Sequence, residues 1–176
     1  MINFYALPLK SVMIIIAVLI FCWICGDIVF GSDKSLYRQV WINGNRILCI
    51  LEFMLIIKMT LFGRTTGSRE LELWPFYTLT TIAYNNEAIR TMVMNVILFL
   101  PFGLTLPYIF TKIRNNYSRW MVCIFTGFLI SVVIETIQYY FGLGRAETDD
   151  VICNTFGCTL GVLADVLADF WESRKT

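Results

Sequence analysis

Long apolar stretches, separated by short polar ones, dominate the chain. Five segments combine the length, apolar content and polar flanks of membrane-spanning helices, each of which needs about 20 residues. They cover residues 11–30, 47–63, 90–110, 120–141 and 150–170. The second is the weakest, because it is short and carries Glu52 and Lys58, which require interior polar contacts or snorkelling to the interface. The pattern predicts an all-α fold, a polytopic integral membrane helix bundle of about five transmembrane helices.

The composition agrees with a membrane location. Of the 176 residues, 57% are hydrophobic and 15% are charged, and the mean hydropathy is +0.68, whereas soluble domains are far more polar. These spans leave no room for a separate soluble catalytic domain, so function is expected within the membrane body or its loops. A net charge of +1, without a Lys/Arg-rich run, argues against a nucleic-acid partner.

Catalytic and metal chemistry is restricted by the absence of histidine. The commonest general base and the commonest metal ligand are therefore missing, and we expect no cofactor and no metal. The six cysteines are scattered through apolar segments, where a thiol behaves as a small hydrophobe. The Cys22-x-x-Cys25 spacing has no second cysteine pair to complete a metal site, so the cysteines are interpreted as reduced packing residues.

The basic residues of alternate loops indicate an orientation. One side of the predicted bundle carries eight of them, namely Lys34, Arg38, Arg46, Lys112, Arg114, Arg119, Arg174 and Lys175. The other side carries five, namely Lys10, Arg64, Arg69, Arg90 and Arg145. By the positive-inside rule, the N-terminus, the loop of residues 64–90 and the segment of residues 144–150 are predicted to lie outside. That loop carries aromatic residues, interpreted as anchors at the bilayer interface or, alternatively, as the lip of a binding site: Trp74, Phe76, Tyr77 and Tyr84.

Polar residues recur at helical spacing inside the fourth predicted span. Ser131, Glu135 and Gln138 fall at positions i, i+4 and i+7 and therefore share one face of the helix. A carboxylate at membrane depth must face protein or water, so Glu135 is expected to point away from lipid. In the third span, Asn95 is a further polar residue and Gly103 permits the close approach of a neighbouring helix.

A second polar face runs along the fifth predicted span. It begins with Asp150 and Asn154 and continues through Gly157 and Gly161, a spacing of small residues that lets another backbone come close. The same face ends at Asp165. A polar outer end and a glycine-lined middle predict a tightly packed helix whose polar end is held in place.

Charged residues are concentrated in the segment GRAETDD, just before this span. Thr148 is interpreted as the N-cap, and Asp149 and Asp150 as first-turn acids that complement the helix dipole. Capping does not explain Arg145 and Glu147. The alternatives are capping with ion pairing alone, or a polar site shared with the other spans. The candidate residues of that site are Asn95, Ser131, Glu135, Gln138, Arg145, Glu147, Asp149, Asp150 and Asn154.

The motifs that carry these residues resemble those of the VanZ-like membrane proteins. They are NVILFLPFGLTLP, SVVIETIQ and GRAETDDVICNTFGCTLG, preceded by LELWPF. The matching positions are Leu73, Pro75, Phe76, Asn95, Pro101, Gly103, Ser131, Glu135, Gln138, Glu147, Asp149, Asp150, Asn154, Gly157 and Gly161. The resemblance predicts a VanZ-like membrane domain in residues 47–170. An extra N-terminal transmembrane helix and loop in residues 1–46 precede it, and a short tail in residues 171–176 follows.

The resemblance implies a multi-pass protein of the bacterial cell membrane, part of the cell envelope. The namesake of the family is associated with resistance to glycopeptide antibiotics of the teicoplanin type. We therefore expect a protein that contributes to such resistance by binding or occluding at the outer membrane face. Its expected partners are the lipid bilayer and either a lipopeptide antibiotic or a lipid-linked cell-wall precursor.

Two alternatives remain open at this point. An intramembrane enzyme that modifies a lipid-linked envelope substrate would use Glu135, Asp149 and Asp150 to hold a divalent cation. The missing histidine and the lack of a nucleophile motif disfavour catalysis. A small transporter would use Glu52, Lys58 and Glu135 as relay residues. The sequence leaves the oligomeric state open.

Overall fold

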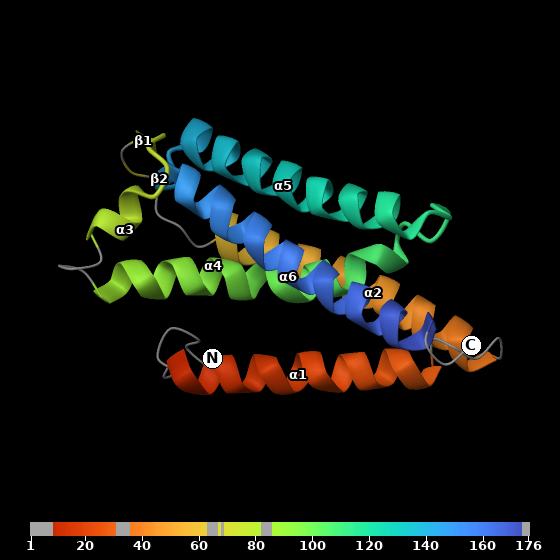
Figure 1. Cartoon of the computed structure of the whole chain (residues 1–176). Coiled ribbons are helices and arrows are strands. Elements are labelled where there is room, and N and C mark those ends of the chain that lie inside the picture. Colours follow the sequence, from red (N-terminus) through yellow and green to blue (C-terminus); the bar gives the residue numbers. More distant parts are fainter. Residues whose placement is uncertain (1–8, 31–35, 63–66, 68, 82–85, 174–176) are drawn as a thin grey trace.

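The computed structural model describes residues 9–30, 36–62, 67, 69–81 and 86–173. Its long helices are α1 (Leu9–Phe30), α2 (Leu36–Leu61), α4 (Asn86–Thr105), α5 (Asn116–Phe141) and α6 (Thr148–Ser173). The short elements are β1 (Glu70–Glu72), α3 (Tyr77–Thr81), the 3-10 helix η2 (Leu106–Tyr108) and β2 (Arg145–Glu147). The long helices run alongside one another in a single bundle (Figure 1), which confirms the predicted all-α architecture. Five residues used in the sequence argument lie outside the described residues: Lys34, Arg64, Tyr84, Arg174 and Lys175.

Four helices in the described part of the chain are long and apolar enough to cross a membrane: Leu36–Leu61, Ala88–Tyr108, Asn116–Phe141 and Thr148–Phe170. The protein is therefore a multi-pass membrane helix bundle. Helix α1, 22 residues long, covers the first predicted span.

The start of the second span was predicted wrongly. The prediction was residue 47, but α2 begins at Leu36 and is 26 residues long. The first half of α2 contains polar residues such as Asn45. This side chain is nevertheless buried, because it accepts a hydrogen bond from Trp23 Nε1 (2.9 Å) and donates one to the carbonyl of Trp41 (3.0 Å). Paired in this way, a polar side chain no longer excludes a membrane helix.

The two ends of the bundle carry different elements (Figure 1). One end holds β1, β2, α3 and the start of α1, and the other holds η2, the start of α5 and the end of α6. The two loops predicted to lie outside therefore share one end with the start of α1. Which side of the membrane this end faces stays a prediction from the basic residues.

Helices α4 and α6 form the closest contact in the bundle because glycines line it. A Cβ atom on Gly157 would lie 2.1 Å from the carbonyl oxygen of Val96, and one on Gly161 would lie 2.2 Å from that of Leu100. From the α4 side, a Cβ on Gly103 would lie 2.1 Å from the carbonyl oxygen of Cys158. No side chain fits at such distances, so the glycines allow direct contact between the two backbones.

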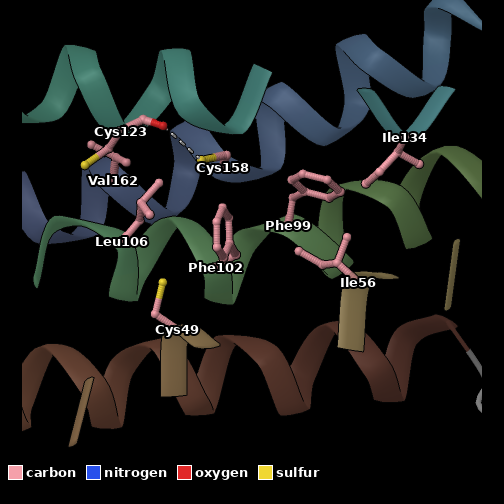
Figure 2. Close-up of a cluster of buried hydrophobic side chains, with 9 residues drawn as sticks. All are labelled: Cys49, Ile56, Phe99, Phe102, Leu106, Cys123, Ile134, Cys158 and Val162. Atoms are coloured by element: carbon pink, nitrogen blue, oxygen red, sulfur yellow. Dashed lines mark hydrogen bonds between the residues drawn. The ribbon is translucent and has the colours of Figure 1, made fainter. Parts of the chain in front are cut away.

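An apolar core joins α2, α4, η2, α5 and α6 (Figure 2). Its buried members are Cys49, Ile56, Phe99, Phe102, Leu106, Cys123, Ile134, Cys158 and Val162. All six cysteines are free. Four of them, Cys49, Cys123, Cys153 and Cys158, are buried packing residues as predicted, while Cys22 and Cys25 are exposed on α1.

The charged residues of α2 find different environments. Glu52 accepts a hydrogen bond from Thr105 Oγ1 of α4 at 2.5 Å, which supplies the interior contact that a carboxylate at this depth requires. Lys58 is exposed near the end of the helix. The two residues thus lie in different surroundings.

Candidate functional site

A two-stranded parallel ladder brings together segments that are far apart in the sequence. In this ladder Leu71 of β1 faces Ala146 of β2, and Glu72 faces Glu147. Next to it, Gly67 N donates to the carbonyl of Gly142 at 2.8 Å. The sequence reasoning predicted neither strand. Their pairing fixes the loop before α3 onto the connection between α5 and α6.

Asp149 fastens the Leu-x-Pro-Phe element to the start of α6. Its Oδ1 accepts from Phe76 N at 2.5 Å and its Oδ2 from Thr78 N at 2.7 Å, and the residue is only 4% exposed. Asp149 does lie in the first turn of α6, as predicted. Its carboxylate, however, binds the backbone of a different segment rather than serving only its own helix. Thr148 is itself the first residue of α6.

Arg145 is surrounded by carboxylates. Its guanidinium lies 3.0 Å from Glu72, 3.7 Å from Glu147 and 3.9 Å from Glu70. It also lies over the ring of Tyr77, 5.3 Å from the centroid. Three carboxylates already compensate the charge of Arg145, so its role is to hold the β1–β2 ladder together.

Glu135 connects α5 to β2. The carboxyl group is buried and its Oε2 accepts a hydrogen bond from Glu147 N at 3.1 Å. The side chain of Glu147 is half-buried, and burial raises its pKa while Arg145 opposes the shift. The carboxyl groups of Glu135 on α5 and Glu147 on β2 therefore both lie close to the backbone of β2.

The polar faces of α5 and α6 meet one turn deeper. There Asn154 Nδ2 of α6 donates to Ser131 Oγ of α5 at 2.9 Å. Gln138 lies nearer the end of α5 and contacts another helix, since its Nε2 donates to the carbonyl of Thr60 on α2 at 3.1 Å. Ser131, Gln138 and Asn154 are all buried.

Three buried side-chain amide atoms of α4, α5 and α6 have no hydrogen-bond partner in the described part of the chain: Asn154 Oδ1, Gln138 Oε1 and Asn95 Nδ2. Native proteins seldom leave such atoms unsatisfied, and buried water commonly fills the gap. The structure therefore joins Ser131 to Asn154 and Glu135 to Glu147, but the Nδ2 of Asn95 is hydrogen-bonded to neither pair. Asp150 is half-buried in the first turn of α6.

A groove of about 240 Å³ opens beside Glu135 and Glu147, between α5, β1 and β2. We call it the α5–β2 groove. Its walls are largely apolar, with the two carboxylates as the acidic residues that line it. The apolar lining includes Leu71, Leu73, Val132, Tyr139, Ala146 and Val151. Because Val132 and Tyr139 are exposed on α5, the groove is accessible from the side of that helix.

The groove uses residues that sequence reasoning missed. Leu71 and Leu73 were available as a signal, because they alternate with Glu70 and Glu72 in the manner of a short strand. Trp74 and Phe76 do not line the groove and are exposed, which fits the interpretation of the loop aromatics as interface anchors.

Comparisons with known proteins agree with the motifs. The family model described as VanZ/LLP1 matches residues 46–168. The curated Protein VanZ of Enterococcus faecium is 38% identical over 73 residues, a match that covers 42% of this chain and 42% of the relative. The chain thus matches less than half the length of that relative. No solved structure gives a significant match. The family match covers most of the chain, and this protein belongs to the VanZ/LLP1 family.

Proposed function

We propose that this protein binds an amphiphilic ligand in the α5–β2 groove at the outer face of the bacterial cell membrane. By retaining or occluding that ligand it lowers the access of a teicoplanin-type glycopeptide to its target. The ligand is either the lipopeptide antibiotic itself or the lipid-linked cell-wall precursor. Binding requires no covalent chemistry.

The observation that carries this proposal is the composition of the groove. An apolar wall accessible from the side of α5 suits an acyl chain that arrives from the bilayer. The carboxyl groups of Glu135 and Glu147 suit a polar or cationic head that supplies hydrogen-bond donors. An amphiphile joins both kinds of group in one molecule, so its two parts match the two parts of the groove.

The location of the groove agrees with the predicted orientation. It lies at the end of the bundle that holds β1 and β2 (Figure 1), the end that the basic residues predict to be outside. Membership of the VanZ/LLP1 family supports a role in glycopeptide resistance, as the association of the family's namesake suggests.

The contacts of the acidic residues do not favour a metal-dependent enzyme. Both oxygens of Asp149 accept backbone N–H groups, and Oε2 of Glu135 accepts another. Among the described residues, no group of three His, Cys, Asp or Glu side chains is arranged to hold a metal ion. A relay from Glu52 to Lys58 is not favoured either, because Glu52 binds Thr105 while Lys58 is exposed.

Filling the groove tests the proposal. The chain is expressed in a glycopeptide-susceptible bacterium, and the inhibitory concentrations of teicoplanin and vancomycin are measured. Wild type is expected to raise the teicoplanin value, and Val132→Trp to return it toward that of the host, because the indole occupies the groove. Val133→Trp is the matched control, since Val133 is the neighbouring exposed residue and does not line the groove.

Two results would contradict the proposal. One is unchanged susceptibility in cells whose membranes contain the wild-type chain at a level verified by immunoblot. The other is a Val132→Trp variant, present at the same level, that protects as well as wild type and Val133→Trp.

A further inference from the structure

A second polar cluster lies at the end of the bundle opposite to β1 and β2. There a partly open cavity of about 90 Å³ is lined by residues near the end of α1, the start of α2, the start of α5 and the end of α6, together with η2. We call it the η2 cavity. Its charged lining residues are Asp27, Arg38, Arg119, Asp165 and Asp169. Sequence reasoning did not identify this cluster, and the α5–β2 groove does not involve it.

Asp27 brings a buried carboxylate from α1 into the cavity. The residue is 7% exposed. Its Oδ1 accepts hydrogen bonds from Trp41 Nε1 at 2.8 Å and from the hydroxyl of Tyr108. Its Oδ2 accepts none from the residues that the structure describes. One oxygen of this carboxylate therefore has no hydrogen-bond donor among the described residues.

The other two carboxylates share one guanidinium. Arg119 lies 3.1 Å from Asp169 and 3.7 Å from Asp165. Asp165 is 4% exposed and also accepts from Trp120 Nε1 at 3.0 Å. Within the described ranges, neither Asp27 nor Arg38 forms an ion pair.

Two charged residues of the η2 cavity, Asp27 and Arg38, are left without an ion-pair partner among the described residues. Three carboxylates and two guanidiniums line the cavity, and of the guanidiniums only Arg119 forms ion pairs within the part of the chain that the structure describes, with Asp165 and Asp169. An uncompensated carboxylate is costly at membrane depth. Among the described residues, Asp27 inside the cavity has no cationic partner, and Arg38 at the exposed rim has no anionic one. A ligand that carries one positive and one negative group would form an ion pair with each of the two residues.

The aromatic residues and the size of the cavity narrow the ligand further. Trp41 and Tyr108 line it, and aromatic rings favour an ammonium group. The volume suits a group the size of roughly three water molecules. In the described part of the chain no cluster of carboxylates is arranged for a metal ion. An ammonium group on a two-carbon arm has three heavy atoms, which matches this volume, and the phosphate that it carries would lie at the exposed rim beside Arg38.

We propose that the η2 cavity binds a phosphoethanolamine headgroup, with the ammonium at Asp27 and the phosphate at Arg38. The headgroup belongs to a membrane lipid or to a soluble phosphoethanolamine compound. The site is independent of the α5–β2 groove and places a lipid contact on the α1 side of the bundle.

Titration of the purified full chain in detergent tests the site, with tryptophan fluorescence as the readout. The lipid arm compares short-chain phosphatidylethanolamine with phosphatidylglycerol of the same acyl chains. The soluble arm compares phosphoethanolamine with ethanolamine and with glycerol phosphate. We expect phosphatidylethanolamine to bind about tenfold more tightly than phosphatidylglycerol, the value of one charge-assisted hydrogen bond. Binding in the soluble arm as well would show that the headgroup suffices, whereas binding in the lipid arm alone would identify the bilayer as its source.

Paired variants separate the two charges. Asp27→Asn is expected to abolish the preference for phosphatidylethanolamine, while the control Glu70→Gln removes an exposed carboxylate at the other end and keeps it. Arg38→Gln is expected to weaken phosphoethanolamine but not ethanolamine. Its control is Arg114→Gln, which removes an exposed arginine that does not line the cavity.

Equal affinity for the two lipids would overturn the proposal, and so would wild-type selectivity in Asp27→Asn. If Asp27→Asn does not fold, Arg38→Gln still decides, since Arg38 is exposed. Unchanged phosphoethanolamine binding in that variant would refute the proposed site.

Discussion

Removing the carboxylate of Asp149 should release the turn at residues 76–78, which directly follows the groove-lining residues Leu71 and Leu73. Asp149 accepts hydrogen bonds from two backbone N–H groups, those of Phe76 and Thr78. Hydrogen bonds to a charged group contribute about 1.5–3 kcal/mol each, so Asp149→Ala costs the turn about 3 kcal/mol at the lower end. The φ of 62° at Phe76 lies in the left-handed region, where a side chain costs roughly 1–2 kcal/mol, so the turn depends on these hydrogen bonds to stay closed.

The consequence is local and can be measured by amide hydrogen exchange. A loss of about 3 kcal/mol in the opening free energy speeds exchange roughly a hundredfold at Phe76 and Thr78. Peptides from α6 should keep their wild-type protection, because glycine contacts hold that helix against α4. Asp150→Ala is the matched control, since it removes the neighbouring acid of the same helical turn.

Exchange at the wild-type rate for the amides of residues 76 and 78 in Asp149→Ala would contradict this role of the carboxylate. Release of the same two amides to the same extent in Asp150→Ala would contradict it as well. Either result would mean that the parallel pairing of β1 with β2 holds the segment without the carboxylate.

Two further predictions concern packing and protonation. Gly157→Ala should lower the thermal stability of the chain in detergent by about 1–3 kcal/mol, because the new Cβ meets the carbonyl oxygen of Val96; Gly44→Ala, with open space at its Cβ, should not. Burial raises the pKa of Glu147, so its contribution to stability is present in full below the usual value of about 4.3 and is lost as the pH rises through the folded value. Glu147→Gln should therefore flatten the stability curve above about pH 4 in denaturant titrations. A steeper curve would contradict the assigned burial.

Helix positions and inward-facing residues were accessible from the sequence because they depend on local spacing. Apolar length identified the spans, and the i, i+4, i+7 pattern put Ser131, Glu135 and Gln138 on one face, where all three are buried. The contact between Asn154 and Ser131 follows from two such faces that meet. In these cases the helical periodicity of the sequence is enough to predict which side chains face the interior.

Contacts between segments far apart in the sequence could not be predicted from local spacing. A three-residue strand such as β1 has no periodicity of its own, and its partner β2 follows more than seventy residues later. The carboxylate of Asp149 was assigned to its own helix because capping is a local rule, whereas its partners lie on another element. The bond between Asp27 and Tyr108 likewise depends on how α1 docks, which no local pattern specifies.

The two cavities differ in their relation to the family. The α5–β2 groove lies within residues 46–168, the part that the family model matches, so its properties can be shared by relatives. The η2 cavity takes Asp27 and Arg38 from residues before that part, so the proposed headgroup site depends on the N-terminal helix. The two functions should therefore be separable in one chain. Asp27→Asn should lose lipid selectivity and retain any antibiotic protection. Val132→Trp should lose antibiotic protection and retain lipid selectivity. If both variants lose both properties, the two ends of the bundle are coupled and the sites do not act independently.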